Sequence, residues 1–432
     1  MKILTISAFF PPYTYGGYEI RVGDIIDELS RRGHEIRVLT TKPDRALKAA
    51  ANSFPYAVIR RLHGPGRKMS FLDRLTTHKL TRWLGISLVF LRKIWYDIQD
   101  TALLDAQINT FRPDLIYLGH IMPLSRALIP YLAKQTVPIV ADEGGKGLIY
   151  TWEDRGLWQR FVAEFPESPA LLAGIKKLFI WAVERVSKGR VGTIWAFPQA
   201  IRAFFNSNLN KGNAEAAGVP LKEARVIHSG IDANFFAFER VKEFGSPLTI
   251  LVPGRIEEQK RQLDAVRLGA LLKTKDIPFE MVIIGEPWNK AYTEQVETEI
   301  RAASLEKEVR ILPMAGRAEL VRLYHWADIT LFLSAYQSGF SRVPLEAMAC
   351  GSLVISYGFE GSDEIIRSDE NGLLIAIGDL ENAVTELGRL INKEQLTKQL
   401  LLNARTNVET KHSMDFYITQ IEGFLLQSIT NY

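Results

Sequence analysis

The stretch from Leu331 to Ser356, LFLSAYQSGFSRVPLEAMACGSLVIS, contains two short apolar runs separated by a loop and a helix-forming segment. Leu331 to Leu333 ends an apolar run of the kind that forms a buried parallel strand. Arg342 to Cys350 contains strong helix formers, and Gly351 follows where a C-capping glycine is expected. Leu353 to Ile355 then begins a second strand. This order predicts a βαβ unit, and hence an α/β fold with a doubly wound parallel sheet.

The loop of this unit is suited to an anion. Ser338 and Ser341 are small, so a ligand can approach the backbone closely. The helix that follows presents free N–H groups and its positive dipole end at Arg342 and Val343. Glu346, in the first turns, can accept two hydroxyl hydrogen bonds, as a ribose diol would supply. The alternative is an ordinary strand–loop–helix connection in which Glu346 only complements the helix dipole.

Length and composition restrict the architecture. A chain of 432 residues is too long for one ordinary core, so two domains are expected. The single cysteine, Cys350, excludes an intramolecular disulfide and a cysteine-based metal cluster, which fits a reducing cytoplasm. The N-terminal MKILTISAFFPP lacks the apolar core of a signal peptide. The longest apolar stretch, Trp83 to Leu91, is much shorter than the roughly 20 residues of a membrane-spanning helix.

Charge is distributed unevenly along the chain. Residues 1–250 hold 34 Lys and Arg against 23 Asp and Glu, giving +11, whereas residues 251–432 hold 19 against 26, giving −7. The basic excess is concentrated from Arg60 to Lys93, where aromatic and aliphatic residues are interleaved with cations. Residues 60–95 are therefore a candidate surface for an anionic membrane. The alternative is a helix packed on its own domain with a solvated basic face. No nucleic-acid-binding motif accompanies the basic residues.

The first half of the chain begins with a second βαβ pattern. Lys2 to Ser7 is a predicted strand, and Gly16-Gly17 lies between it and a predicted helix, where the backbone could approach a phosphate or a sugar. The alternative is a turn with a structural role only. His120 ends a later strand, at the edge of an α/β sheet where ligands bind, although a lone His at such a place is more often a structural residue. Asp142 and Glu143 end the next strand and could line a binding site or belong to a solvated loop.

The second half repeats this logic. Leu248 to Val252 is a predicted strand, and Arg255 and Lys260 lie on the loop at its carboxyl end. Two cations at this place can neutralise a diphosphate, arginine with paired donors and lysine as a point charge. The alternative is two solvated surface cations.

These motifs together resemble the retaining glycosyltransferases of family 4, which have the GT-B fold. The family pattern is a Glu, seven residues, and a second Glu that begins a Glu-Ala-Met-Ala-x-Gly run, and Glu346 to Gly351 matches its second half. Ser338 stands where the family has its first Glu, which lies at the donor sugar. The segment from Pro11 to Glu19, with its Pro-Pro and Gly-Gly pairs, is also similar to the family.

The resemblance implies a fold, a site and a reaction. It implies two Rossmann-like domains facing a central cleft, with an acceptor domain at 1–240, a nucleotide-sugar domain at 241–412 and a returning helix at 413–432. His120 and Ser338 would lie at the sugar as catalytic residues. The donor would contact the residues Gly16, Gly17, Arg255, Lys260, Ser341, Arg342, Val343 and Glu346. Asp142 and Glu143 would lie on the acceptor side.

The sequence thus predicts a glycosyltransferase that moves a sugar from a nucleotide-diphosphate sugar to a glycan or lipid-linked glycan in cell-surface polysaccharide synthesis. The resemblance implies retention, and no cofactor is expected. The single cysteine and the basic segment predict a cytoplasmic location, peripheral on the inner face of the membrane. No Asp-x-Asp motif follows an apolar strand, so no metal is expected. Two alternatives remain: a GT-B protein without transfer activity that binds a donor or a partner, favoured by Ser338, and a nucleotide-sugar epimerase.

Overall fold

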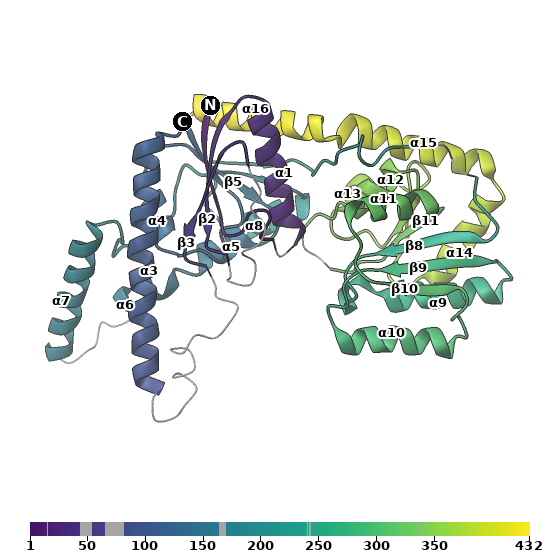
Figure 1. Cartoon of the computed structure of the whole chain (residues 1–432), viewed down its shortest axis with the longest axis horizontal. Helices are drawn as coiled ribbons and strands as arrows, with labels where there is room; N and C mark the ends of the chain where they lie inside the picture. The colour runs from purple at the N-terminus through teal and green to yellow at the C-terminus, as the bar shows by residue number, and fades with distance from the viewer. Residues whose placement is uncertain are drawn as a thin grey trace. The chain divides into compact units, whose positions relative to one another are not determined.

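The computed structural model describes residues 1–14, 16–43, 54–64, 82–163, 170–239, 241, 243–336 and 339–432. The chain forms two compact units (Figure 1). Unit 1 contains Met1–Phe205, Asn210–Arg225 and Ile421–Tyr432, and unit 2 contains Asn206–Leu209 and Val226–Gln420. These divisions differ from the sequence-based boundaries at 240 and 412, and the functional role of each unit stays a prediction.

Unit 1 is built on a seven-stranded sheet with the order β3-β2-β1-β4-β5-β6-β7. The recorded strand pairs from β3 through β6 are all parallel. The strands are β1 Lys2–Ser7, β2 Glu35–Thr41, β3 Ala57–Leu62, β4 Leu115–Leu118, β5 Ile139–Glu143, β6 Arg202–Phe205 and β7 Glu223–Val226. The strand order reverses between β1 and β4, which is where doubly wound sheets bind their ligands.

Helices cover both faces of this sheet. α1 lies on one face, and α3 and α4 lie on the other (Figure 1). The helices of unit 1 are α1 Gly17–Arg31, α3 Arg82–Phe111, α4 Leu128–Leu132, α5 Gly147–Glu153, α6 Gly156–Ala163, α7 Ala170–Ser187 and α8 Asn208–Ala216, with the end of α16 Met414–Thr430.

Unit 2 repeats this arrangement with six strands in the order β10-β9-β8-β11-β12-β13. All of its strand pairs are parallel. The strands are β8 Leu248–Pro253, β9 Phe279–Ile284, β10 Val309–Leu312, β11 Ile329–Phe332, β12 Leu353–Ser356 and β13 Leu373–Leu374. Here the order reverses between β8 and β11, so the stretch that begins at Leu331 leaves the sheet at its switch point.

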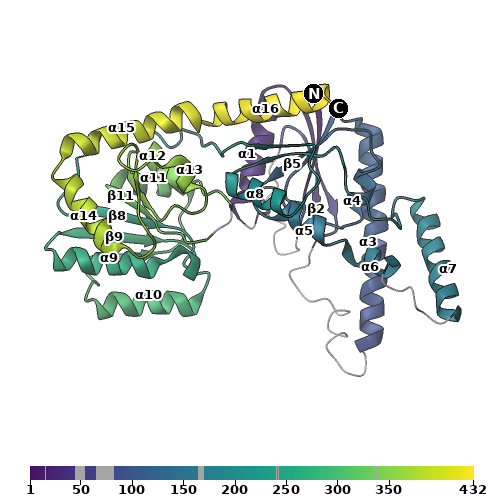
Figure 2. The ribbon, with the colours of Figure 1, turned by 180° about the vertical axis from the view of Figure 1, so that it is seen from behind.

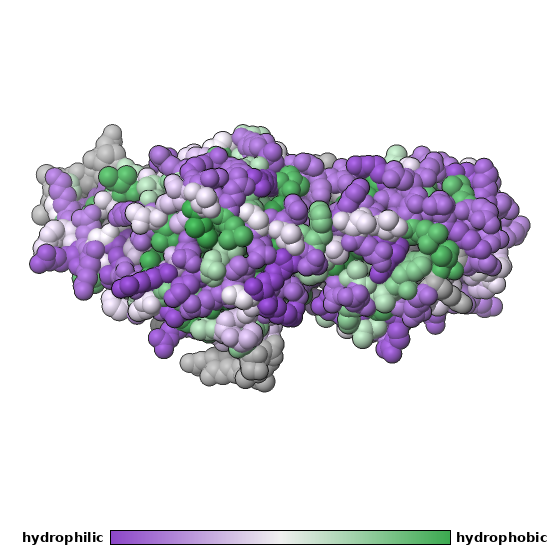
Figure 3. Space-filling model, turned by 90° about the horizontal axis from the view of Figure 1, so that it is seen from above, coloured by the Kyte–Doolittle hydropathy of each residue, from purple (hydrophilic) through white to green (hydrophobic). Residues whose placement is uncertain are grey.

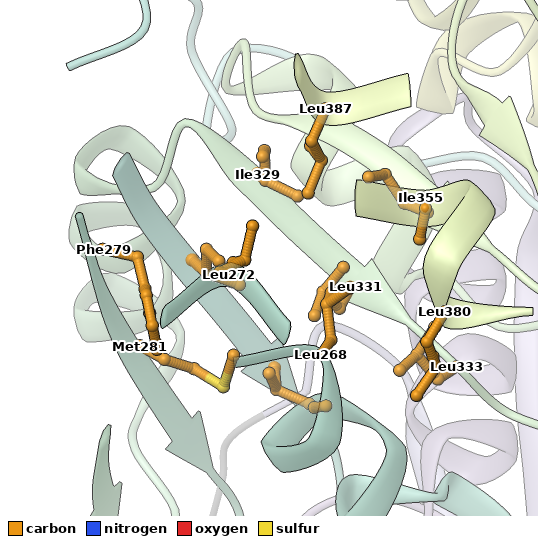
Figure 4. Close-up of a cluster of buried hydrophobic side chains, with 14 of the residues drawn as sticks. Leu268, Leu272, Phe279, Met281, Ile329, Leu331, Leu333, Ile355, Leu380 and Leu387 are labelled. Atoms are coloured by element: carbon orange, nitrogen blue, oxygen red, sulfur yellow. The ribbon is translucent and has the colours of Figure 1, made fainter. Parts of the chain in front are cut away.

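Two layers of helices enclose the second sheet (Figures 1 and 2). α9 Gln262–Thr274, α10 Lys290–Ala302 and α14 Leu380–Ile391 pack with one face through a core that includes Leu268, Met281 and Leu331 (Figure 4). The other face packs with α11 Arg317–Trp326, α12 Val343–Ala349, α13 Ser362–Ile365 and α15 Glu394–Lys411. Because both faces are covered, the strands are apolar along most of their length.

The predicted α/β fold with doubly wound sheets is confirmed. The strand, helix and strand expected between Leu331 and Ser356 are β11, α12 and β12. The basic segment is described only in part, because residues 65–81 lie outside the described residues. Within α3, Ile94 is buried whereas Leu91 and Trp95 are about half exposed, so both interpretations of this segment have support. Among the described helices, none is long and apolar enough to cross a membrane.

Candidate functional site

The cations predicted for a diphosphate lie at the carboxyl ends of the strands of unit 2. Arg255 follows β8, and Lys260 ends a short 3-10 helix, Glu258–Lys260. The loop after β8 and the loop after β11 are joined by a hydrogen bond from the Ala335 N–H to the Gln259 carbonyl, 2.9 Å long. Lys260 also lies 5.7 Å from the ring centroid of Phe332. The structure therefore brings these cations to the loop that leads to α12.

Both cations already have protein partners. Lys260 donates to the Glu360 carboxylate, and both side chains are largely buried. Arg255 pairs with Glu257 at 2.9 Å and lies over the Trp288 ring at 4.7 Å. A diphosphate bound here would compete with carboxylates for Lys260 and Arg255.

The amides at the start of α12 are partly occupied as well. The Ser341 N–H donates to the Glu360 carbonyl at 2.9 Å, and the Val343 N–H donates to Ser341 Oγ at 3.3 Å. Arg342 is the N-cap residue and has a helical conformation. α12 thus begins with N–H groups that are bonded within the protein, so a phosphate here would have to replace some of these bonds.

Glu346 is half-buried in the first turn of α12. Its Oε2 accepts a hydrogen bond of 3.1 Å from the Tyr324 hydroxyl. Tyr324 is fully buried, and burial, with the nearby Glu346 carboxylate, raises its pKa well above the usual value. The tyrosine therefore stays a neutral donor that orients Glu346. Ser338, the predicted catalytic residue of this loop, lies outside the described residues.

In unit 1, His120 forms a pair with Glu19. His120 Nδ1 lies 2.8 Å from Glu19 Oε1, and the Gly16 N–H donates to Glu19 Oε2 at 2.9 Å. Burial opposes ionisation of Glu19, but the His120 and Gly16 hydrogen bonds prevail and lower the pKa of its carboxyl. The pair arises because β1 and β4 are adjacent parallel strands, whose carboxyl ends share one edge. Glu19 thereby fixes the His120 ring.

A pocket of about 150 Å³ opens beside His120. The loop from Glu143 to Gly147 forms one side, and Tyr18 and Tyr150 form others. The Tyr18 and His120 ring centroids are 5.2 Å apart. His120 is therefore placed where it can meet a small polar group in unit 1.

The two acceptor-side candidates have different environments. Asp142 is fully buried, accepts from Arg21 and Tyr117, and does not line the pocket. Glu143 lines the pocket, and its carboxylate accepts from the Gly145 and Leu148 N–H groups at 2.7 and 2.6 Å. Asp142 is therefore bonded within the protein, Glu143 is bonded to the loop around His120, and the acceptor-side role of both stays a prediction.

The glycine pair lies at the start of α1. A Cβ added at Gly17 would meet nothing within 4 Å, and one at Gly16 would meet only the Glu19 carboxylate at 3.9 Å. Packing within the protein does not require glycine at either place. An added Cβ would have room at both places among the described residues, and the contact of Gly16 and Gly17 with a ligand stays a prediction.

Sequence reasoning did not assign roles to Tyr18, Glu19 and Arg21. Their position in the first turns of the helix after β1 could have indicated a role, because this helix begins at the same sheet edge as His120. Among the described residues, no group of three or more His, Cys, Asp or Glu side chains could hold a metal ion.

Comparison with known proteins covers nearly the whole chain. Residues 15–235 match the model of Glycosyltransferase Family 4, and residues 235–407 match that of Glycosyl transferases group 1. The amylovoran biosynthesis glycosyltransferase AmsK of Erwinia amylovora is 30% identical over 215 residues, 49% of this chain and 52% of the relative. The chain thus spans about half the length of such curated relatives.

Solved structures share the fold. The glycosyltransferase from Rickettsia africae aligns with 100% of this chain and 99% of its own, with 15% identity and a TM-score of 0.69. Anabaena Alr3699/HepE, solved in complex with UDP, aligns over 99% and 100% with 18% identity and a TM-score of 0.65. These likenesses confirm the predicted two-unit fold. Since the model of Glycosyltransferase Family 4 matches half of the sequence, this chain belongs to glycosyltransferase family 4.

Proposed function

We propose that this protein transfers a sugar, with retention and without a metal, from a nucleotide-diphosphate sugar to a glycan or lipid-linked glycan. The observation that carries the proposal is the convergence of Arg255, Lys260 and Glu346 on one edge of unit 2. Glu346 accepts the ribose hydroxyls, and the two cations face the diphosphate. The charge that develops on the leaving phosphate is then stabilised by groups already in place.

The ion pair between Lys260 and Glu360 adds a step to this proposal. When the diphosphate binds, Lys260 exchanges the Glu360 carboxylate for phosphate oxygens. Lys260 is largely buried, and an unpaired buried charge would be unfavourable. The exchange leaves its ammonium group paired with an anion both before and after the diphosphate binds. In unit 1, His120 is held by Glu19 and is proposed to contact the transferred sugar. This role rests on the family resemblance, and so do the roles proposed for Gly16, Gly17 and Ser338.

A cell-surface polysaccharide is the proposed destination of the sugar. It is supported by the name of AmsK, which describes amylovoran biosynthesis. An inner-membrane surface is proposed as the place of work, because half-exposed Leu91 and Trp95 on α3 are matched by exposed Leu178 and Trp181 on α7. The face of the molecule that Figure 3 shows is mostly hydrophilic, with apolar residues in separate groups, and is not proposed as the membrane surface.

The test of donor binding is a thermal-shift screen with UDP, GDP, ADP and their sugars. A ligand that binds the folded chain raises its melting temperature by mass action. We expect a shift with one nucleotide in the wild type and in Glu297→Ala, an exposed control on α10, and no shift in Glu346→Ala. Sugar transfer by the wild type should persist in EDTA.

Other outcomes would point elsewhere. A nucleotide shift without transfer to any glycan acceptor would favour the non-transferring protein, and Ser338→Glu would then be expected to restore transfer. A change of the donor sugar without an acceptor would favour the epimerase.

A further inference from the structure

Unit 1 contains a second and larger pocket, of about 340 Å³. Its walls come from the end of β3, from α3, from the loop before α4 and from the loop between α5 and α6. Only Met122 also lines the pocket beside His120. The volume lies within the roughly 300–1,000 Å³ of sites for small molecules.

The back wall of this pocket is held rigidly. Asp100 is buried and accepts from His63 Nδ1 at 2.8 Å and from the His63 N–H at 3.2 Å. The His63 ring stacks on Tyr96, with 3.9 Å between the centroids. Because these side chains are already ordered, a ligand would bind without the cost of ordering them.

Two polar groups on this wall have capacity for a ligand. Asp97 Oδ1 accepts from the Ser125 hydroxyl, and Oδ2 has no hydrogen-bond partner among the described residues. The Tyr96 hydroxyl likewise has no partner within the described part of the chain. Burial raises the pKa of the Asp97 carboxyl to about 7, so it can accept or donate near neutral pH. A carboxyl and a hydroxyl that line the same pocket suit a ligand rich in hydroxyl groups.

The pocket lining holds three cations, Lys93, Arg126 and Arg155, and three carboxylates, of which only Asp154 lies at the rim. Asp154 pairs with Arg160 and lies near Arg126, so its charge is balanced. Arg155 is exposed and has no ionic partner among the described residues, and the exposed Lys93 also lines the pocket. Exposed Leu157 and Met122 add apolar surface. Such a rim fits a ligand with an anionic group as well as apolar C–H faces.

We propose that this pocket binds a saccharide unit with an anionic group, placing its hydroxyls on Asp97 and Tyr96 and its anionic group on Lys93 and Arg155. This inference rests on the proposed transferase function, because a glycan acceptor would bring such a saccharide. It names an acidic sugar as part of that acceptor, in a pocket other than the one beside His120.

The test measures the affinity of the full chain for oligosaccharides of hexuronic acids. It compares this affinity with that for the same oligosaccharides after their carboxyl groups have been reduced to alcohols. We expect the acidic set to bind at least tenfold more tightly than the reduced set. Arg155→Glu should weaken acidic binding at least tenfold, and Tyr96→Phe should weaken it severalfold. Lys177→Glu, an exposed charge reversal on α7, should leave it unchanged. All variants should keep the nucleotide thermal shift.

The outcomes separate this inference from the proposed function. A nucleotide shift without binding of any oligosaccharide would overturn the pocket assignment alone, as would equal binding of acidic and reduced sets. If no nucleotide raised the melting temperature of the wild type, the proposed function would be overturned instead. Equal affinity for a free acidic saccharide and for the same saccharide on a prenyl diphosphate would support the assignment, and binding of the lipid-linked form alone would contradict it.

Discussion

Single carboxylates in unit 1 have opposite electrostatic roles. Glu19 is stabilised in its charged form by His120 and the Gly16 N–H, whereas Asp97 is destabilised in its charged form by burial. Both side chains lie near the ends of parallel strands, where a doubly wound sheet binds ligands. Their environments, more than their chemical type, therefore decide how each one responds to pH.

Replacing Glu19 with Gln should remove a pH-dependent contribution to stability. The folded pKa of Glu19 is below its unfolded value near ~4.3, so its contribution is present above that value and is lost as pH falls through the folded pKa. Glu19→Gln should lower the free energy of unfolding by about 1–3 kcal/mol at pH 7 and less at pH 3. Urea unfolding, with exposed Glu153→Gln as control, measures this. A difference that does not depend on pH would contradict the prediction.

Replacing Asp97 with Asn should have the opposite effect. Its folded pKa of about 7 lies above the unfolded value, so its carboxyl lowers stability as pH rises from ~4 to 7. The stability of Asp97→Asn relative to the wild type should therefore increase by about 1–3 kcal/mol when the pH is raised from 4.5 to 8. Guanidinium unfolding at the two pH values measures the gain. A gain that is larger at pH 4.5 would show that Asp97 is not held neutral by burial.

At the scale of elements, the loops after β8 and β9 in unit 2 touch through their backbones. A Cβ added at Gly285 would lie 1.9 Å from the Gly254 carbonyl oxygen, and Gly254 itself has φ +143°, where L side chains are rarely found. Arg255 follows directly in sequence. Glycine at these places is therefore what allows the predicted diphosphate loop to lie where it does.

We expect Gly285→Ala to destabilise the protein by several kcal/mol, about 2–4, because backbone atoms would have to move. It should also reduce the nucleotide thermal shift. Gly388→Ala on α14 has open space around the added Cβ and should be neutral or stabilising by up to ~1 kcal/mol. Differential scanning calorimetry of both variants makes the comparison. Equal melting temperatures would show that the loop has room that the structure does not indicate.

The C-terminal helix α16 completes the core of unit 1. Phe424 is fully buried, with its ring centroid 6.2 Å from that of Phe204 and 5.0 Å from the Arg225 guanidinium. Arg202 Nη1 donates to the Ser428 carbonyl at 2.7 Å, which fixes the end of the helix. The end of α16 is therefore a structural part of unit 1.

Truncating Phe424 to Ala should cost about 3–5 kcal/mol, because a buried ring leaves a cavity. Phe416→Ala removes the same atoms from the same helix, but its side chain is 41% exposed, so a loss of less than ~1 kcal/mol is expected. Tryptophan fluorescence during urea unfolding reports the difference. Similar losses for the two variants would mean that Phe424 is not packed as described.

At the scale of the whole molecule, the two units carry different candidate sites. Arg255, Lys260 and Glu346, proposed for the nucleotide, lie in unit 2, and the His120 pocket and the acidic-saccharide pocket both lie in unit 1. Each unit is a doubly wound sheet with its own switch point. The nucleotide contacts proposed for unit 2 can therefore be tested apart from the two pockets of unit 1.

Hydrogen exchange should show this separation. The nucleoside diphosphate that gives the largest thermal shift should slow exchange in peptides covering 254–260 and 339–346, by roughly tenfold or more. Peptides covering 94–100 and 139–148 should exchange as before. Mass spectrometry of exchange in the full chain, with and without the nucleotide, measures both sets. Protection confined to unit 1 would reverse the proposed assignment of the donor.

Much of the fold followed from the sequence. The apolar runs at Leu331, Leu353 and Leu248 became β11, β12 and β8, because a strand buried on both faces has to be apolar along its length. Gly351 follows α12 as a C-capping glycine would, with φ +78°. The site residues Arg255, Lys260 and Glu346 could be named because loops at the carboxyl ends of parallel strands form the ligand edge.

Contacts between distant segments depended on the tertiary structure. Glu19 and His120 are 101 residues apart, and Lys260 and Glu360 are 100 apart, so no local pattern reveals either pair. The sequence by itself determined the two parallel sheets and the edges where ligands bind, since periodicity and glycine positions act locally. Only the tertiary structure decided that Asp142 is buried and that Asp97 and His63 share a pocket, because burial and pairing depend on which strands become neighbours.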